Sequence, residues 1–520
     1  MSNQNGAPHT FGIDDMAVYI PRLYLSIEEL ARHRDLDPDK LTKGLGLIKM
    51  SVPDRHEDAA TMAANAIRRL LDRNKIDPRS IGRIYLGTES ALDDSKPTAT
   101  YIMGMLEDFF GSQYGEDCFR HCDVVDLNFA CVGGVDALQN TLDWVKGGQD
   151  RLGIVVSSDI AKYELGSTGE YTQGAGAVAM LVKRSPRLVA IQDNWGVASA
   201  SVHDFFKPKR RATKHQIVEE VLRLAEIVGY HPTQLLEKIE DSLTVNGILD
   251  ANEEEIVIHK ETPVFDGPYS NQCYQQRIRE AIDHFRHQAS NQIKEDESLT
   301  NRWSRIIFHL PYAFQARRMF SEIYMREAKR SGAWQDIQSA IEAEEPTPEL
   351  FDKREDYEKA YGKFLRALTK TDVYRQFVKE KIQKGEAASS LVGNMYTGSI
   401  FLSLMSCLEL DLKDGIDMAG RQLGFIGYGS GSKSKVFEAT VQTGWKKIVE
   451  QFKLDDRLDN RRRIDYATYE HLHRGRMESS VIPPSREFAI DRISYDQPLV
   501  GARYYRWKEA VGEKQASARS

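Results

Sequence analysis

The stretch from Asp126 to Val135, DLNFACVGGV, constrains this chain more than any other. Its first five residues continue an apolar strand pattern, and from Val135 onward apolar residues recur at helical spacing. Cys131 is therefore predicted at a junction between a strand and a helix. Free N–H groups and the helix dipole favour a thiolate there, and the thiolate is the nucleophilic form. The glycines at 133 and 134 leave room for an acyl group near the backbone.

The alternative interpretation of Cys131 is a small, buried apolar residue, which is a common role of free cysteine. This stretch alone does not choose between a nucleophile and a core residue. The choice depends on whether other reactive side chains occupy similar junctions elsewhere in the chain.

Predicted strands alternate with predicted helices along most of the chain, which favours an α/β class. Two glycine-rich approaches to strands, at 174–180 and 427–432, echo each other and suggest a duplicated architecture. We therefore expect an N-terminal half at 1–186 and a C-terminal half at 187–450, followed by a C-terminal extension at 451–520 with a disordered tail after Gly512.

Two charged, helix-patterned segments interrupt the second half, near 207–260 and 333–385, and are predicted to be helical insertions on the outside.

Composition excludes several classes of protein. The 520 residues are 41% hydrophobic and carry a formal net charge of −7, so no global basic excess points to nucleic acid or a membrane surface. We find no apolar run of about 18 residues and no signal-like start, and expect a soluble, cytoplasmic protein. Five cysteines make no disulfide framework, and Cys118 and Cys122 lack the second pair that a zinc site needs. No metal is expected.

Three further side chains lie at predicted element junctions, where α/β folds expose functional groups. Glu89 follows a buried strand, His309 follows Ile306–Phe308, and Asn394 precedes an apolar helix. Each has a plain alternative: a solvated carboxylate, a structural histidine and a helix cap. Together with Cys131, however, they form a chemical set: an acyl carrier, a base for a carbon acid, and two groups that bind a carbonyl oxygen.

The stretches that carry these residues follow one another in an order typical of one family, across most of residues 12–445. They are Leu86–Ser90, Asn128–Gly134, Ser158–Ala161, Gly174–Ala179, Phe308–Tyr312, Gly393–Ser399 and Tyr428–Ser432. In this order the chain resembles the 3-hydroxy-3-methylglutaryl-CoA (HMG-CoA) synthases of the thiolase superfamily. The resemblance implies a thiolase-like fold, with duplicated α/β halves in α-β-α-β-α layers, and a homodimer.

The resemblance also implies the reaction. Cys131 takes acetyl from acetyl-CoA as a thioester, and Glu89 removes a proton from the acetyl methyl. The resulting carbanion attacks the ketone of acetoacetyl-CoA, whose oxygen is bound by His309, and water releases HMG-CoA, a precursor on the mevalonate route to isoprenoids. The CoA thioesters are substrates, and no cofactor is expected. The N–H of Cys131 and one near Ser430 are expected to form an oxyanion hole.

The family's substrate-contacting positions correspond to Thr172, Asn394 and Ser430, and Arg318 stands where the family has a lysine. Lys40, with Lys207 and Lys209, is a candidate for the CoA phosphates.

Three departures accompany this match. Val132 replaces a common tyrosine beside the nucleophile, Phe314 replaces a CoA-binding lysine, and about fifty extra residues follow Lys207.

The alternatives that remain open are other uses of the same fold. A ketoacyl synthase would use Cys131, His309 and Asn394, but a carboxylate at Glu89 would repel a malonyl thioester. A polyketide β-branching synthase would take its substrate from a carrier protein. A scaffold subunit that partners a thiolase would need none of these reactive residues.

Overall fold

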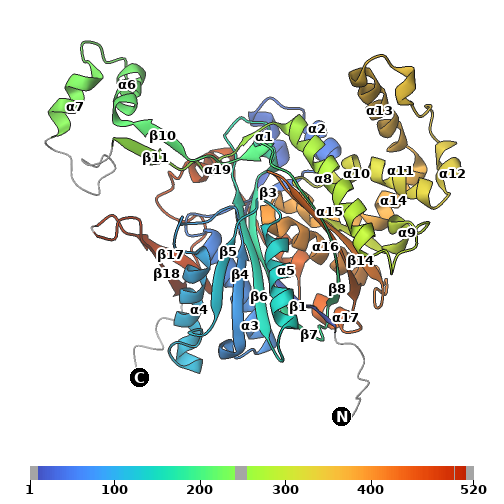
Figure 1. The fold of residues 1–520 in the computed structure, drawn as a ribbon. Helices are drawn as coiled ribbons and strands as arrows, with labels where there is room; N and C mark the ends of the chain where they lie inside the picture. The colour runs from blue at the N-terminus through green and yellow to red at the C-terminus, as the bar shows by residue number, and fades with distance from the viewer. Residues whose placement is uncertain (1–9, 241–253, 497, 511–520) are drawn as a thin grey trace.

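The computed structural model describes residues 10–240, 254–496 and 498–510. A nine-stranded sheet runs through the body, in the order β13-β14-β15-β8-β1-β7-β6-β4-β5 (Figure 1). Its strands are β1 (Phe11–Tyr19), β4 (Ile81–Gly87), β5 (Asp123–Leu127), β6 (Leu152–Ala161), β7 (Gly174–Arg184), β8 (Val189–Ser199), β13 (Arg305–Phe308), β14 (Gln422–Gly429) and β15 (Lys433–Val441).

The sheet consists of two matching halves that meet at β1 and β8. In the first half, β4 and β6 are parallel, and β6, β7 and β1 are successively antiparallel. In the second half, β13 and β14 are parallel, and β14, β15 and β8 are successively antiparallel. The two central strands pair antiparallel, with Gly12 opposite Ala190. This repeated pattern confirms the predicted duplication.

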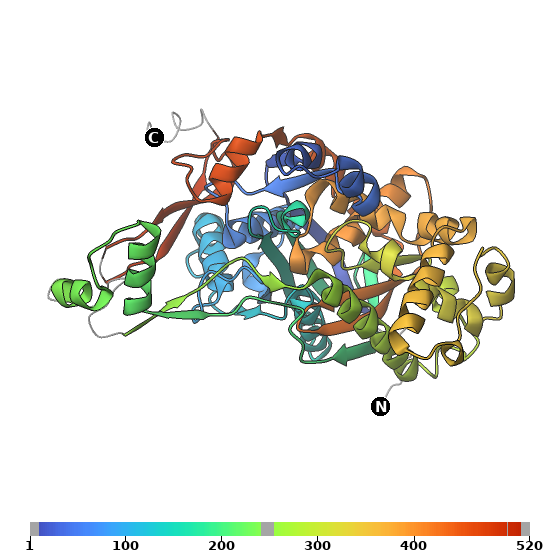
Figure 2. The same cartoon turned by 90° about the horizontal axis from the view of Figure 1, so that it is seen from above.

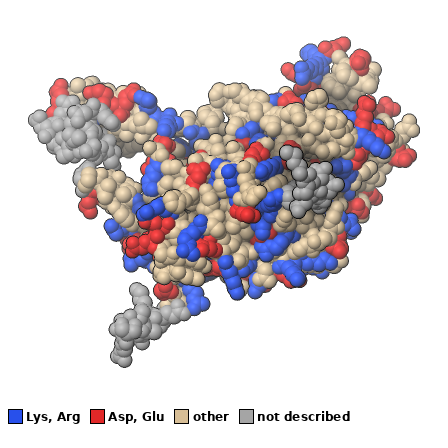
Figure 3. All heavy atoms as spheres, turned by 60° about the horizontal axis from the view of Figure 1, so that its bottom comes forward, with Lys and Arg blue, Asp and Glu red and all other residues tan. Residues whose placement is uncertain are grey.

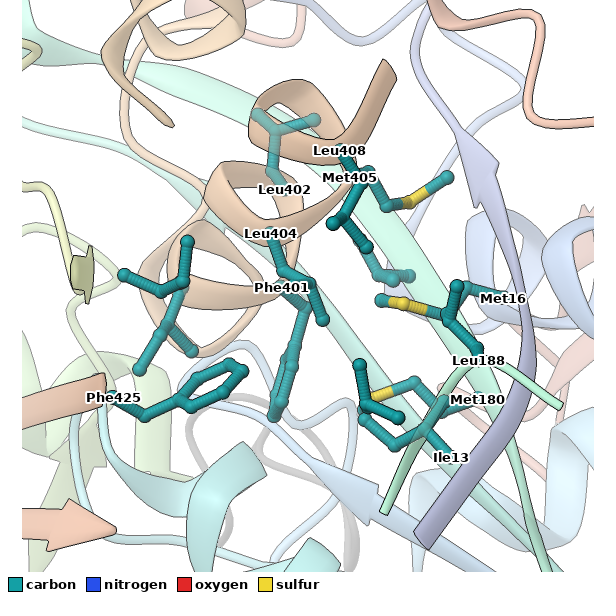
Figure 4. Close-up of a cluster of buried hydrophobic side chains, with 14 of the residues drawn as sticks. Ile13, Met16, Met180, Leu188, Phe401, Leu402, Leu404, Met405, Leu408 and Phe425 are labelled. Carbon is teal, nitrogen blue, oxygen red and sulfur yellow. The ribbon is translucent and has the colours of Figure 1, made fainter. Parts of the chain in front are cut away.

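Two helices, α5 (Gly133–Lys146) and α16 (Ser399–Lys413), pack against the inner faces of both halves, in a core that also contains β1, β7, β8, β14 and β15 residues. Helix α16 is buried almost all round, because its apolar side chains occupy every face and its serines are small enough to be buried with them. Figure 4 shows Phe401 and Met405 of α16 facing Met16 and Met180 of the sheet. Burying each such side chain contributes about 1.5–3 kcal/mol.

The outer faces are covered by other helices. Helices α3 (Ala59–Asn74) and α4 (Thr98–Tyr114) pack on the first half, and α8 (Gly267–Gln288) packs on the second. The order of layers is therefore α-β-α-β-α, as predicted. Because α5 and α16 begin at the same end of the inner layer, the loops that precede them share one site.

The segment predicted as the first insertion forms an arm that projects from the body (Figures 1 and 2). At its root, β9 (Phe205–Phe206) pairs with β12 (Val264–Phe265). Farther out, β10 (Arg210–Thr213) pairs with β11 (Glu255–Ile258) and carries α6 (Lys214–Leu224) and α7 (Pro232–Glu240). The segment is thus helical in part, as expected, and the arm contacts the body through its root strands and through the ion pairs Lys209–Asp94 and Lys260–Glu164.

The second helical segment does more than cover the surface. It contains α12 (Trp334–Gln338), α13 (Arg354–Leu368), α14 (Asp372–Lys381) and α15 (Gln383–Val392). Its buried Trp334, Phe364 and Tyr374 share a core with α8, α11 (Ser321–Arg330) and β13. This segment therefore helps to hold the strand that ends at His309.

The C-terminal extension is integral to the body up to residue 510. Strand β16 (Arg462–Arg463) extends the small sheet of β2 (Leu23–Ser26) and β3 (Lys49–Val52). The hairpin of β17 (Glu487–Ile493) and β18 (Arg503–Lys508) lies on α3 and buries Phe488. The tail predicted to be disordered lies outside the described residues.

The remaining helices are short or peripheral: α1 (Ile27–His33), α2 (Pro38–Leu45), α9 (Leu299–Arg302), α10 (Gln315–Met319), α17 (Trp445–Val449), α18 (Leu454–Asp459) and α19 (Tyr466–His473). Within the described ranges, no helix combines the length and apolar character needed to cross a membrane. The face in Figure 3 mixes basic and acidic side chains, in keeping with the small net charge.

Candidate active site

The nucleophile candidate lies in a strained turn between β5 and α5. Ala130 adopts a left-handed backbone with φ of 38°, which costs energy for a residue with a side chain. Val132 N–H donates to Phe129 O at 3.1 Å and closes the turn. Cys131 is 9% exposed. The predicted junction is confirmed, and the turn directs the thiol into an enclosed site.

Glu89 reaches Cys131 because Gly87, at the end of β4, lets the start of α5 approach the strand closely. A side chain on Gly87 would collide with the backbone of Gly133 and Gly134. The glycines after Cys131 thus serve helix–strand packing, and the expectation that they make room for an acyl group is not needed to explain them. With α5 seated this closely, the Cys131 thiol donates to Glu89 Oε1 at 3.0 Å.

A buried carboxylate, Asp159 at the end of β6, holds the loop that carries Glu89. Its Oδ1 accepts from Glu89 N at 2.7 Å and from Thr88 Oγ1 at 3.0 Å. Its Oδ2 accepts from Thr397 N at 3.0 Å, in the loop before α16. Asp159 therefore ties the general-base candidate to the second half of the chain.

Burial dominates the electrostatics of the pair. It raises the pKa of Glu89 to about 7, with the Asp159 charge adding to the rise and Lys207 opposing it. Burial and the adjacent Glu89 raise the pKa of the Cys131 thiol well above its usual value. The helix start was expected to favour the thiolate, whereas burial and the neighbouring carboxylate favour the thiol.

His309 follows β13 directly and is buried, with its backbone N–H donating to Ile426 O at 3.0 Å. Burial lowers the pKa of His309 to about 3, and the Tyr396 backbone partly opposes this shift. Its imidazole is therefore neutral near pH 7. Neither ring nitrogen has a hydrogen-bond partner of normal geometry within the part of the chain that the structure describes. Such a buried, neutral ring can offer one N–H to an oxygen.

Aromatic side chains enclose Cys131. The buried rings of Tyr163 and Tyr396 form one cluster with Cys131, and Phe205 and Phe265 of the arm root pack against it. The Tyr163 and Phe265 ring centroids lie 5.4 Å apart, and those of Phe205 and Tyr396 lie 6.0 Å apart. This wall excludes water, which strengthens every charge interaction inside.

The three predicted substrate contacts surround the same site. Thr172 and Asn394 are joined by a hydrogen bond from Asn394 N to Thr172 O at 2.9 Å. The Asn394 amide oxygen also accepts from Tyr396 N at 2.8 Å, a local turn bond, while the N-cap of α16 is Gly398 and not Asn394. Ser430 follows Gly429. A Cβ atom added at Gly429 would lie 2.9 Å from both Phe129 O and Val132 N. The Ser430 loop therefore packs directly on the nucleophile turn.

The candidate phosphate ligands divide into two groups. Lys40 is exposed on α2, and Arg318 is exposed on α10. These helices are adjacent, because Phe314 N donates to Leu45 O at 3.1 Å and the Phe314 ring fills the space over Gly46. Lys40 and Arg318 thus remain candidates for one phosphate-binding edge.

The other two candidate lysines lie beside carboxylates. Lys209 pairs with Asp94 at 2.5 Å, and Lys207 lies beside Glu89, with 4.0 Å between Nζ and Oε2. Val132, the departure beside the nucleophile, is fully buried in the inner core and packs on Gly427 and Gly429.

A metal ion could fit one group of side chains in the described ranges, formed by His56, Glu57 and Glu487. Tyr19 already donates to Glu57 at 2.5 Å and to Glu487 at 2.8 Å, and Arg22 pairs with Glu487. These bonds explain the group as a clamp between the body and β17. Glu89, Cys131 and His309 are not part of it.

Comparison with known proteins identifies the family. The profile for the hydroxymethylglutaryl-coenzyme A synthase N terminal matches residues 7–186, and that for the C terminal matches residues 257–481. The hydroxymethylglutaryl-CoA synthase of Haloferax volcanii is 33% identical, over 89% of this chain and 91% of its own length. The chain belongs to the HMG-CoA synthase family. It is therefore an acyl-transferring condensing enzyme with a thiolase-like fold.

More distant members agree. The HMG-CoA synthase of Enterococcus faecalis is 26% identical, over 91% of this chain and 94% of its own length. The structure of MvaS in complex with 3-hydroxy-3-methylglutaryl coenzyme A has a TM-score of 0.72 and 27% identity, and covers 96% of this chain and 100% of that one. The two profile matches leave out residues 187–256, which include most of the arm.

Sequence reasoning missed several groups that build the site. Asp159 lies in the stretch Ser158–Ala161, to which no catalytic role was assigned, and Lys207 was considered only for the CoA phosphates, whereas in the structure it lies beside Glu89. Tyr163, Phe205 and Phe265 were not singled out. The signal available for Asp159 was a carboxylate at the end of an apolar strand, the same signal that identified Glu89.

Proposed function

We propose that this protein condenses acetyl-CoA with acetoacetyl-CoA and water to give HMG-CoA and free CoA. The observation that carries the proposal is the buried Cys131–Glu89 pair at 3.0 Å, in a site closed by aromatic rings. A thiol and a base in contact can form a thioester, and a carboxyl with a pKa of about 7 can then act on a weak carbon acid.

In the first half-reaction, the Cys131 proton passes to Glu89 while sulfur attacks the acetyl carbonyl. Departing CoA takes a proton, which leaves acetyl-Cys131 and a Glu89 carboxylate. We assign the oxyanion to backbone N–H groups of the Cys131 turn and of the Ser430 loop, which pack against each other.

In the second half-reaction, Glu89 removes a methyl proton from acetyl-Cys131. The carbanion attacks the ketone carbon of acetoacetyl-CoA, and the new alkoxide takes the proton that Glu89 had removed. The neutral imidazole of His309 supports this step as a hydrogen-bond donor to the ketone oxygen. Asn394 and Thr172 hold the acceptor, and hydrolysis of the Cys131 thioester frees the product.

Incubation with radiolabelled acetyl-CoA alone tests the covalent step. We expect one label per chain, absent in Cys131→Ala. Glu89→Ala should form almost no carbon–carbon bond from chemically acetylated Cys131. An unlabelled wild-type protein would rule out the acyl-enzyme.

The identity of the acyl carrier needs a separate test. Because the relative solved with HMG-CoA bound is similar over its whole length, we propose free CoA thioesters as substrates. Lys40 and Arg318 are the proposed phosphate ligands. A strong preference for acetoacetyl attached to a carrier protein over acetoacetyl-CoA would favour the β-branching alternative.

We also propose a homodimer, on the family resemblance, and a location in the cytoplasm, as expected from the sequence. Light scattering of the purified protein tests the dimer, and fractionation of cells tests the compartment.

A further inference from the structure

Lys207 lies at the root of the arm, immediately after β9, and its side chain is only 14% exposed. Its ammonium donates to the backbone oxygen of Glu89 at 3.3 Å and lies 4.0 Å from Glu89 Oε2. It also lies 4.8 Å from the centre of the Tyr396 ring, in a cation–π contact. A lysine held by three contacts in a closed site is placed there by the fold.

The charged and titratable groups facing Glu89 come from several elements. They are the Cys131 thiol, the Asp159 carboxylate, and the phenols of Tyr163 and Tyr396. All of these are neutral or negative, and the opposing positive charge comes from Lys207. Glu261, on the other side of the arm, also faces Lys207 but is paired with Lys162 at 2.8 Å.

This arrangement bears on a problem in the proposed chemistry. Glu89 accepts the Cys131 proton during acetylation and must lose it to departing CoA before it can accept a methyl proton. Burial favours the protonated acid and so works against this reset. A fixed ammonium beside the carboxylate favours the ionised form that the second proton transfer needs.

We propose that Lys207 is a positioning residue that returns Glu89 to its carboxylate form between the two proton transfers. The inference rests on the proposed function. Lys207 takes no part in the transfer itself: the proton moves from Cys131 to Glu89 and then to CoA. The root of the arm thereby supplies a charge on which both half-reactions depend. Lys207 itself precedes the fifty or so extra residues of the arm.

The size and sign of the effect follow from the distance. An opposite charge at 4–6 Å lowers the pKa of a carboxyl by roughly 1–3 units. Without Lys207 the pKa values of Glu89 and Cys131 both rise, so the acid limb of the rate profile moves to higher pH. One pKa unit corresponds to about a tenfold loss of rate at a pH below the limb.

The test compares kcat against pH for wild type, Lys207→Met, Lys207→Arg and Lys260→Met. Methionine keeps the length of the side chain and removes its charge. Lys260 pairs with Glu164 and ties the opposite strand of the arm to the body, so Lys260→Met controls for loosening of the arm.

In Lys207→Met we expect the acid limb of the kcat profile to shift to higher pH by one or more units. The value of kcat should fall at least about tenfold at pH 7 and recover near pH 9. Lys207→Arg should restore most of the wild-type profile, and Lys260→Met should leave it unchanged. An equal loss at every pH, or an unmoved limb, would overturn the inference. A wild-type protein that condenses nothing would instead refute the proposed function.

Discussion

Replacing Gly87 by alanine tests whether the close approach of α5 to β4 sets the Cys131–Glu89 distance. The new methyl would lie 2.7 Å from the Gly133 carbonyl carbon and nearer still to Gly134, whereas ordinary contact begins at 3.4 Å. The obstructing atoms are backbone, so the strand and the helix must separate by about 1 Å to bring the nearest contact, at Gly134, to an ordinary distance. Glu89 and Cys131 move apart with them.

A misplacement of this order costs roughly 10²-fold in rate, and overpacking costs about 1–3 kcal/mol of stability. Single-turnover acetylation of Cys131 measures the first effect, and chemical denaturation measures the second. The matched control is Gly104→Ala in α4, where nothing lies within 4 Å of the added methyl. The Gly104→Ala protein should gain up to about 1 kcal/mol of folding stability and should acetylate at the wild-type rate. A folded Gly87→Ala protein that acetylates at the wild-type rate would refute the role assigned to this contact.

Two other substitutions address the electrostatics. Because the folded pKa of Glu89 is about 7 and its ordinary value is 4.5, its folded carboxyl keeps a proton that the unfolded chain loses, and wild-type stability falls as pH rises between these values. Glu89→Gln should therefore be more stable than wild type, by a margin that widens by up to about 1.4 kcal/mol per pH unit in denaturant titrations; a constant margin would contradict this. Asp159→Asn should lose about 1–3 kcal/mol of folding stability, since the Thr397 N–H loses its acceptor. The same substitution removes a like charge near Glu89, so the acid limb of the kcat profile should move to lower pH. An acid limb that moves to higher pH would show that Asp159 is not a charged neighbour.

The order of the layers and the position of the site could be predicted from the sequence, because both follow from local patterns. Glu89, Cys131 and His309 each end a strand or begin a helix, and aligned strands bring such ends together. The charge state of the pair could not be predicted in full. The helix-start argument for a Cys131 thiolate considers only neighbours in sequence, whereas burial and Glu89, 42 residues away, determine the outcome.

Lys207 illustrates the same limit. In the sequence it belongs to a short basic cluster, which favours solvent or a phosphate. In the structure the pairing of β9 with β12 turns Lys207 inward, while Lys209, two residues on, remains at the surface with Asp94. That pairing joins residues about sixty positions apart, and no local pattern encodes it.

The root of the arm is fixed independently of its length. Buried Asp204 accepts from Tyr428 OH at 2.7 Å and from Gly431 N at 2.7 Å, and its backbone oxygen accepts from Asp266 N at 3.1 Å. Asp204 thus joins the two sides of the root to each other through its backbone, and to the loop that contains Ser430 through its carboxylate. The root strands hold Phe205 and Lys207 in the site. The chain between the two root strands therefore forms a loop whose ends are already fixed. Lengthening such a loop adds only about 0.6 kcal/mol of closure entropy per doubling. A fifty-residue addition at this point is therefore compatible with an unchanged catalytic site.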